Sequence, residues 1–344
     1  MRHCTPLIRL STVLIACLSL TGCDSTDHMP LNVELGGRTV SKLPFVIAAD
    51  QGLYEKYGLD INLKIPDSGR PGIVRSNPGQ DFRPEIFVDG LTPNIVKQVE
   101  RARFPEYMAI ASNDCIVRAH VVANHGIDEL ADLKGRRIGI SARRDTTTGF
   151  AVLELANRMG WDPDHDISIQ FNGRDVEDLE AGRVDAIIAS ETRYAIALRE
   201  GYPVLEDTET WKVAVGGNSV LTTREWLSQG DNREKARRFL QATAEGLAIF
   251  HTNRDLALDV MARWYGIEDA AEREAIYERG QWMPRKPYPC YEGTEETLRM
   301  YDSLEMRKHD PQDFYDDSII RELDDSGFLD GLYGGQAASA ASGS

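Results

Sequence analysis

The stretch RRIGISARRDTTTGFAVLELANRM, residues 136–159, decides the fold class, because a short strand pattern runs directly into a helix pattern. Residues 137–141 form a short run with apolar side chains at alternate positions, which is typical of a strand. The residues that follow have the i, i+3, i+4, i+7 spacing of a helix that packs on a core, at Val152, Leu155, Ala156 and Met159. Strands that alternate with such helices indicate an α/β fold with largely parallel sheets.

The same alternation extends outward from this stretch. The other predicted strands are 32–35, 59–65, 85–89, 107–111, 120–123, 167–171 and 185–189. From Arg224 onward the chain is mainly helical, with a buried stripe predicted at Ala236, Phe239, Leu240, Thr243 and Leu247. We expect two lobes, each a mostly parallel sheet flanked by helices, with the helical return packed on the first lobe.

The predicted domain boundaries follow from this order. Lobe 1 is discontinuous and comprises 31–118 and 222–332, and lobe 2 comprises 119–221. The hinge crossings are expected near 117–122 and 216–221. Residues 23–30 are expected to form a tether, and 333–344 a disordered tail, because its Gly, Ala and Ser bury too little apolar surface to offset the entropy of ordering.

The first residues indicate export. Arg2 and Arg9 precede an apolar run at 10–20, which is shorter than the about 20 residues of a membrane-spanning helix and suits a signal peptide of residues 1–22. The run ends at Leu20-Thr21-Gly22-Cys23, which resembles a bacterial lipobox and implies a lipid on Cys23. We expect an extracytoplasmic protein anchored to the cell (inner) membrane. The alternative is an ordinary secreted protein that is cut elsewhere.

Charge and cysteine content narrow the function further. A formal net charge of −16 argues against nucleic-acid binding, which requires a basic surface. Once the signal is removed and Cys23 is lipidated, Cys115 and Cys290 remain, and they form either one disulfide or two unpaired thiols. No Cys or His spacing is typical of a metal site, so neither a metal nor a cofactor is expected.

Four segments resemble the type 2 periplasmic-binding proteins that serve ABC importers of sulfonates, taurine, nitrate and thiamine-type pyrimidines. They are GLYEKYGLDI at 52–61, DLKGRRIGI at 132–140, TTGF at 147–150 and LEAGRVDA at 179–186. The resemblance implies a monomeric two-lobe α/β fold with a ligand cleft between the lobes, a small-molecule ligand and an ABC permease as partner. Region 67–84 departs from the family pattern because it carries loop signals, which puts that wall of the cleft in doubt.

The candidate site residues follow the predicted strands, because ligands of such sheets bind beyond the carboxyl ends of the strands. The expected ligand-binding residues are Arg38, Thr39, Ser41, Asp89, Gly90, Thr92, Asn113, Ser141, Arg143, Thr146, Thr147, Thr148, Asn172 and Glu191. Arg174 and Asp114 follow strands at the same edge. The turn at 141–149 is the sharpest candidate, since a helix N-terminus and hydroxyls suit an anion and Arg143 supplies charge. The alternative is that Thr146 or Thr147 only caps the helix.

The sequence therefore predicts a binding protein rather than an enzyme. The expected ligand is a small organic anion, sulfonate-like at first guess, and the runner-up is a thiamine-type pyrimidine or another vitamin precursor. An enzyme of the pyrimidine-synthase type is the second function considered, and neither its cysteine-rich run nor a nucleophile and base pair stands out here. A sensor without a permease is the third.

Overall fold

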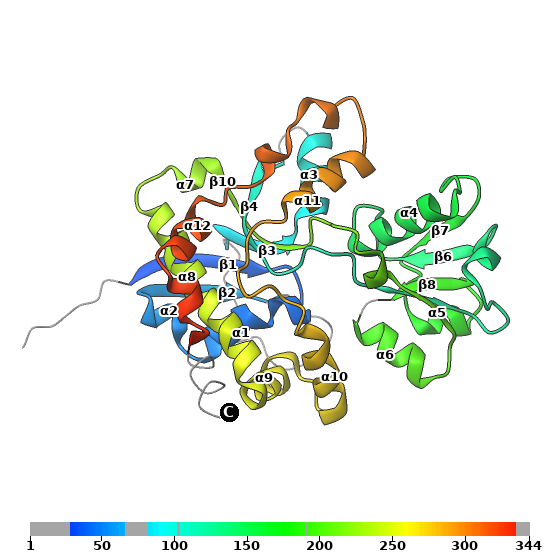
Figure 1. The fold of residues 1–344 in the computed structure, drawn as a ribbon, viewed down its shortest axis with the longest axis horizontal. Helices are drawn as coiled ribbons and strands as arrows, with labels where there is room; N and C mark the ends of the chain where they lie inside the picture. The colour runs from blue at the N-terminus through cyan, green and yellow to red at the C-terminus, as the bar shows by residue number, and fades with distance from the viewer. Residues whose placement is uncertain (1–27, 66–81, 102–103, 190, 335–344) are drawn as a thin grey trace, which may run out of the picture.

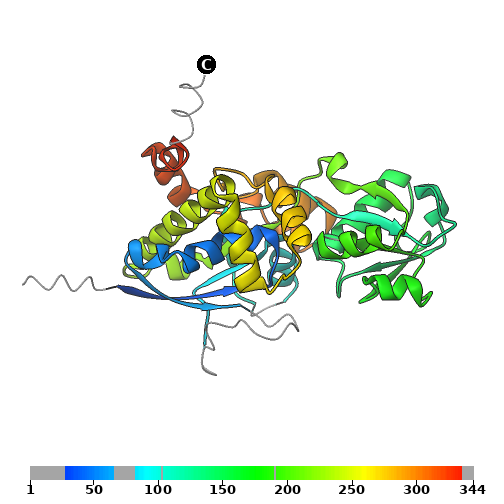
Figure 2. The ribbon, with the colours of Figure 1, turned by 90° about the horizontal axis from the view of Figure 1, so that it is seen from below.

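The computed structural model describes residues 28–65, 82–101, 104–189 and 191–334. Two five-stranded sheets form two lobes that lie side by side along the long axis (Figures 1 and 2). The two-lobe α/β architecture expected from the sequence is confirmed. Within the described ranges, none of the helices combines the length and apolar character that crossing a bilayer requires.

The first sheet has the strand order β2-β1-β3-β10-β4. Its strands are β1 (Met29–Leu35), β2 (Leu59–Lys64), β3 (Ile86–Gly90), β4 (Tyr107–Ser112) and β10 (Asn218–Thr223). Strand β1 runs parallel to β2 and β3, whereas β10 is antiparallel to both β3 and β4.

The second sheet has the order β7-β6-β8-β5-β9 and repeats this topology. Its strands are β5 (His120–Ala123), β6 (Arg137–Ile140), β7 (Ser168–Phe171), β8 (Ala186–Ala189) and β9 (Val204–Asp207). Strand β6 is parallel to β7 and β8, and β5 is antiparallel to β8 and β9. The antiparallel strand is therefore β10 in the first sheet and β5 in the second. Each is the strand that the chain forms directly after it crosses from the other lobe.

The position of β10 corrects the predicted boundary after residue 221. Because Asn218–Thr223 pairs between β3 and β4, the chain has re-entered lobe 1 before Asn218. The chain crosses between the lobes twice, once between β4 and β5 and once between β9 and β10. These two crossing segments pair with each other through an antiparallel bridge between Ile116 and Ala214. Val117 N–H donates to the Val213 carbonyl at 3.0 Å on one side of that bridge. The hinge therefore consists of two short segments that lie against each other.

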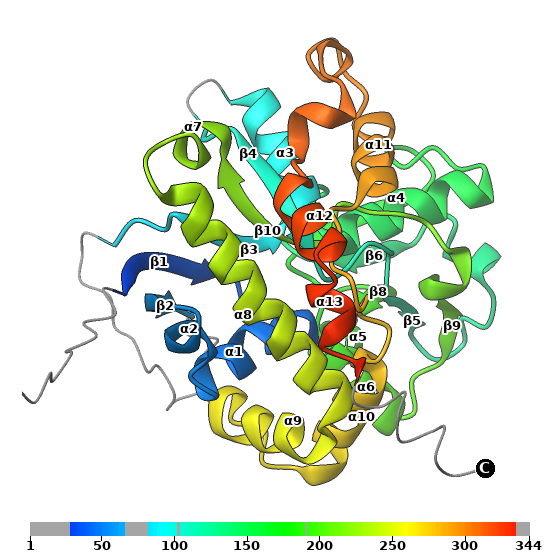
Figure 3. The ribbon, with the colours of Figure 1, turned by 60° about the vertical axis from the view of Figure 1, so that its left-hand side comes forward.

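Helices cover both faces of each sheet, because alternate strand residues point to opposite faces. In lobe 1, α1 and α8 pack over the face that carries Val33 and Met108, and α3 packs over the face that carries Ala109 (Figure 3). The lobe 1 helices are α1 (Leu43–Asp50), α2 (Leu53–Lys56), α3 (Leu91–Glu100), α7 (Arg224–Leu227), α8 (Asn232–Thr252), α9 (Arg254–Val260), α10 (Ala270–Gly280), α11 (Tyr291–Met300), α12 (Ser318–Asp325) and α13 (Phe328–Gly331).

In lobe 2, α4 (Thr147–Met159) covers one face, while α5 (Val176–Glu180) and α6 (Glu191–Arg199) cover the other. The predicted stripe on α4 is confirmed, with Val152, Leu155 and Ala156 fully buried. The predicted stripe on α8 is buried as well. The helical return after Arg224 packs on the first lobe, as expected.

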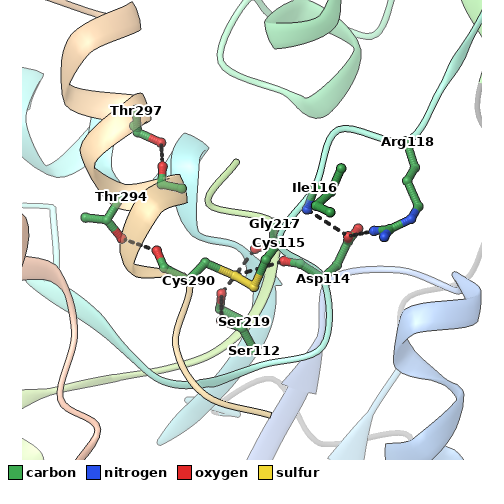
Figure 4. The surroundings of a disulfide bond; sticks show 11 residues. Ser112, Asp114, Cys115, Ile116, Arg118, Gly217, Ser219, Cys290, Thr294 and Thr297 are labelled. Carbon is green, nitrogen blue, oxygen red and sulfur yellow. Dashed lines mark hydrogen bonds and ion pairs between the residues drawn. A yellow bond between two sulfur atoms is a disulfide. The ribbon is translucent and has the colours of Figure 1, made fainter. Parts of the chain in front are cut away.

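A disulfide joins Cys115 on the first crossing segment to Cys290, which precedes α11 (Figure 4). Their Cα atoms lie 5.4 Å apart, within the range that disulfides need. Beside the bond, the hydroxyls of Ser112 and Ser219 lie 2.6 Å apart, which links β4 to β10. Of the two alternatives for these cysteines, the structure has the paired one.

Candidate ligand-binding cleft

A cavity of about 600 Å³ lies between the lobes, at the carboxyl ends of strands from both sheets. Its lining side chains come from lobe 1, at Arg38, Tyr265 and Glu272, and from lobe 2, at Asn172, Asp175 and Arg193. Two of the predicted site residues, Arg38 and Asn172, thus face the same cavity from opposite lobes. A volume of this size is typical of small-molecule sites, which span about 300–1,000 Å³.

In lobe 1, Lys42 forms an ion pair with Asp89. The Nζ atom lies 3.4 Å from Asp89 Oδ1, and the Lys42 side chain is only 3% exposed. Gly36 makes room for Asp89, since a Cβ at position 36 would lie 2.5 Å from the Asp89 carboxyl carbon. A charge buried this deeply needs a partner of opposite sign, and Asp89 supplies it. The sequence interpretation selected Asp89 and missed Lys42.

Two asparagines bring the ends of β4 and β10 to the same backbone group. The Nδ2 atoms of Asn113 and Asn218 donate to the Ser41 carbonyl at 3.1 and 3.4 Å. The Ser41 hydroxyl lies 2.9 Å from that of Thr39. The structure therefore groups Thr39, Ser41 and Asn113 as predicted. Asn218 was missed because no strand was predicted there and the predicted lobe 2 extended to residue 221.

In lobe 2, the turn at 141–149 is held by its own hydroxyl groups. Thr146 caps α4, its Oγ1 accepting from Gly149 N–H at 3.2 Å. Thr148 Oγ1 accepts from Ser141 N–H at 3.0 Å and donates to Ser141 Oγ at 2.9 Å. A Cβ at position 149 would lie 2.2 Å from the Arg144 carbonyl oxygen, so the compact turn requires glycine there. The cap that the sequence left as the alternative is thus present at Thr146, and binding of an anion by this turn stays a prediction.

The two arginines of this turn are each engaged by an aspartate. Arg143 donates from Nε and Nη2 to both carboxylate oxygens of Asp145, which is 3% exposed. The hydrogen bonds to Asp145 raise the pKa of Arg143. Arg144 Nη2 lies 2.5 Å from Asp164. The guanidinium of Arg143, expected to supply charge to a ligand, thus has a carboxylate partner within its own turn.

Arg174 reaches Ser141 from the loop after β7. Its Nη1 donates to Ser141 Oγ at 3.1 Å. The preceding loop is tightly held, because Asn172 has a left-handed φ of 63° and a Cβ at position 139 would lie 1.6 Å from the Gly173 carbonyl oxygen. A left-handed φ is uncommon for a residue other than glycine and often marks a functional site.

The remaining predicted residues lie inside lobe 1 or at the start of a helix. Thr92 is 1% exposed, and its hydroxyl lies 2.7 Å from that of Thr297, so it joins α3 to α11 inside lobe 1. Gly90 precedes α3, and its carbonyl accepts from Asn94. Thr147 is the exposed first residue of α4, and Glu191 is the first residue of α6. Cys23 and most of region 67–84 lie outside the described residues.

The lobes also meet through three stacked groups that no sequence pattern had singled out. The rings of His120 and Tyr194 in lobe 2 are stacked, with centroids 3.6 Å apart. The guanidinium of Arg279, on α10 of lobe 1, lies 4.8 Å from the Tyr194 ring. Burial, and then the charge of Arg279, lower the pKa of His120 to about 4, although Asp207 opposes this shift. His120 is therefore a neutral, buried base beside the interlobe contact.

Aromatic residues near the hinge brace the structure. The Arg118 guanidinium lies 3.8 Å from the Trp282 ring centroid, and Arg118 Nη1 lies 2.7 Å from Asp114 Oδ1. Farther along, the hydroxyls of Tyr288 and Tyr291 donate to Asp324 and Asp317. Among the described residues there is no group of three or more His, Cys, Asp or Glu side chains arranged to hold a metal ion.

Comparisons with known proteins agree with this architecture. The NMT1/THI5-like family model matches residues 113–257, whereas no curated protein matches the sequence. The fold is similar to that of the periplasmic aliphatic sulphonate-binding protein SsuA of Escherichia coli, at 17% identity and a TM-score of 0.61, with 83% of this chain and 98% of that chain covered.

Two further solved structures show how broadly the fold is used. The periplasmic nitrate-binding protein NrtA of Synechocystis PCC 6803 is 11% identical, with a TM-score of 0.63 and coverage of 87% of this chain and 89% of that chain. The desulfurization enzyme DSZB is 14% identical, with a TM-score of 0.56 and coverage of 86% and 98%. The chain thus has the type 2 periplasmic-binding-protein fold indicated by its four motifs, with an NMT1/THI5-like segment at 113–257.

Proposed function

We propose that this protein is an extracytoplasmic solute-binding protein that captures a small organic ligand between its lobes and delivers it to an ABC importer. The observation that carries the proposal is the cavity of about 600 Å³ lined by Arg38 and Tyr265 from lobe 1 and by Asn172 and Arg193 from lobe 2. Because paired crossing segments join the lobes, rotation about them would close the cavity over a ligand.

The proposed ligand is a small organic anion, with a sulfonate-like compound as first guess. The protein carries a formal charge of −16, so an anion must be held by local donors rather than by long-range attraction. Donors line the cavity from both lobes, at Arg38 in lobe 1 and at Asn172 and Arg193 in lobe 2. The names of two proteins with this fold, which mention sulphonate and nitrate, support the same choice. A thiamine-type pyrimidine remains the runner-up.

The proposed site is built around Arg38 and Asn172, which line the cavity, together with predicted residues that follow strands at the same edge of each sheet. They are Arg38, Thr39, Ser41, Asp89, Asn113, Ser141, Arg143, Thr146, Thr148 and Asn172, to which Lys42 and Asn218 are added. The proposed location is outside the cytoplasm, with a lipid on Cys23 holding a monomer at the inner membrane beside its permease. Finding a permease gene beside this one would distinguish this role from that of a sensor without a permease.

Catalysis is the second candidate, because the desulfurization enzyme DSZB has this fold. We propose binding without turnover. A thermal-shift screen of sulfonates, carboxylates, nitrate and vitamin precursors tests binding, since a ligand at 100 times its dissociation constant stabilises by about 2.7 kcal/mol. Mass spectrometry of the recovered ligand tests turnover. A stabilising ligand that is recovered unchanged supports the proposal, and a chemically altered one contradicts it.

A further inference from the structure

The hydroxyl of Ser141 accepts hydrogen bonds from two side chains. A serine hydroxyl can accept two hydrogen bonds and donate one. Ser141 Oγ accepts from Thr148 Oγ1 at 2.9 Å and from Arg174 Nη1 at 3.1 Å, so both of its acceptor positions are filled. The hydroxyl is thus left as a donor at the carboxyl end of β6.

Arg174 differs from the other arginines of this wall. Arg143, Arg144 and Arg193 each form an ion pair with an aspartate. Arg174 forms none with a described side chain, and its contact is with the neutral hydroxyl of Ser141. Burial, and then the nearby charge of Arg193, lower the pKa of Arg174, although Asp175 opposes this shift. A partly buried guanidinium that has no carboxylate partner of its own favours an anion on its solvent side.

The backbone around Arg174 is held in place before any ligand binds. Gly173 packs so closely on β6 that a Cβ at Gly139 would lie 1.6 Å from the Gly173 carbonyl oxygen. Asn172 N–H also donates to the Ser141 carbonyl at 3.4 Å, which ties the loop to the end of β6. Little conformational entropy is then lost when the guanidinium binds a ligand, and preorganised donors bind more tightly for this reason.

We propose that Arg174 and Ser141 form the subsite that binds the anionic oxygen group of the ligand, a carboxylate, sulfonate or phosphate. The remaining guanidinium N–H groups of Arg174 and the Ser141 O–H supply the hydrogen bonds. Helix α4 begins six residues after Ser141, and its N-terminal partial charge favours an anion at the same place. This inference rests on the proposed solute-binding function, and it assigns to Arg174 the role that the sequence suggested for Arg143.

The test is calorimetric titration with ethanesulfonate, propionate and ethyl phosphate as probes, and with propionamide as the uncharged counterpart of propionate. The parent should bind at least one anionic probe more tightly than propionamide. Arg174→Gln and Ser141→Ala should each weaken that binding by about ten- to a hundredfold, the usual effect of losing a hydrogen bond to a charged group. Arg174→Lys should recover part of the loss, since it restores charge without the planar fork.

Two comparisons make the result specific. Arg136→Gln removes the same charge from an exposed side chain just before the other end of β6 and should leave binding unchanged. Arg143→Gln should weaken binding less than Arg174→Gln, because Asp145 already engages Arg143. Each variant is checked for an unchanged unfolding temperature.

The proposal is overturned if Arg174→Gln binds the anionic probes as tightly as the parent, or if the parent binds propionamide as tightly as propionate. It is also overturned if the parent binds none of the anionic probes. In each case a neutral compound that stabilises the parent in the thermal-shift screen would keep solute binding intact, so failure of the subsite and failure of the function are distinguishable.

Discussion

Cys115 and Cys290 are joined by a disulfide although they are 175 residues apart in the chain. Cys115 lies in the first crossing segment, and Cys290 lies immediately before α11 of lobe 1. The neighbouring contact from Cys290 Sγ to the Asp114 carbonyl measures 3.1 Å. The covalent bond therefore fixes the lobe 1 end of the first crossing segment to the segment that precedes α11.

Removing this bond is expected to destabilise the protein without abolishing ligand binding. Loss of a native disulfide that closes a long loop costs about 2–5 kcal/mol. The double variant Cys115→Ser with Cys290→Ser should show that decrease in the free energy of unfolding by chemical denaturation. The parent under reducing conditions is the matched comparison. Equal stability of the oxidised parent and the double variant would contradict this assignment.

Gly139→Ala is expected to destabilise lobe 2 and to move the loop that carries Arg174. The added methyl group would meet the Gly173 carbonyl oxygen at 1.6 Å, so β6 and the loop must separate. Overpacking of this kind costs about 1–3 kcal/mol. Gly331→Ala is the control, because a Cβ there meets nothing within 4 Å. Similar unfolding free energies for the two variants would show that the close approach is absent in solution.

His120 is expected to make stability depend on pH. Its pKa in the folded protein is about 4, below the ordinary value of about 6.5. Between these values the unfolded chain binds the proton and the folded chain does not, so the free energy of unfolding falls as pH drops from about 6.5 towards 4. The groups that face the ring are Tyr194, Asp207 and Arg279.

The measurement is urea denaturation of the parent and of His120→Gln across this pH range. The difference between their free energies of unfolding should shrink at low pH, because the variant lacks the group that resists protonation. Parallel pH profiles would mean that His120 titrates normally in the folded protein.

Cys23→Ala is expected to release the protein from the membrane fraction while leaving it folded. The lipid would be attached outside the α/β body, which begins at β1. Fractionation with a high-salt wash and a thermal melt of the released protein test this. A variant that still sediments with membranes after the wash would contradict the lipoprotein proposal.

The sequence predicts most of the fold because its strands are apolar runs separated by clear helix patterns. The eight predicted strands appear within a residue or two of their expected bounds, apart from β1, which begins at Met29. Strands β9 and β10 were missed. Strand β10 includes Ser219, Thr222 and Thr223, whose hydroxyls obscure its apolar character, and its place between β3 and β4 depends on long-range pairing.

The candidate site was harder to predict than the fold. The end of a strand indicates which residues lie near the cleft, but it does not indicate which side chains they contact. Arg143 and Arg174 both follow a strand, and only the structure shows that Asp145 engages Arg143 whereas Arg174 reaches Ser141. Lys42 was missed because nothing local pairs it with Asp89, 47 residues away. The disulfide was left open for the same reason, since the separation of Cys115 and Cys290 in space has no local signal.

The central claim is that the lobes close over a ligand, and small-angle X-ray scattering tests it most directly. The protein is measured alone and saturated with the compound that gives the largest thermal shift. Rotation about the paired crossing segments should bring Arg38 and Asn172 closer together, and the radius of gyration should decrease. An unchanged radius of gyration at saturation would contradict closure of the lobes over the ligand.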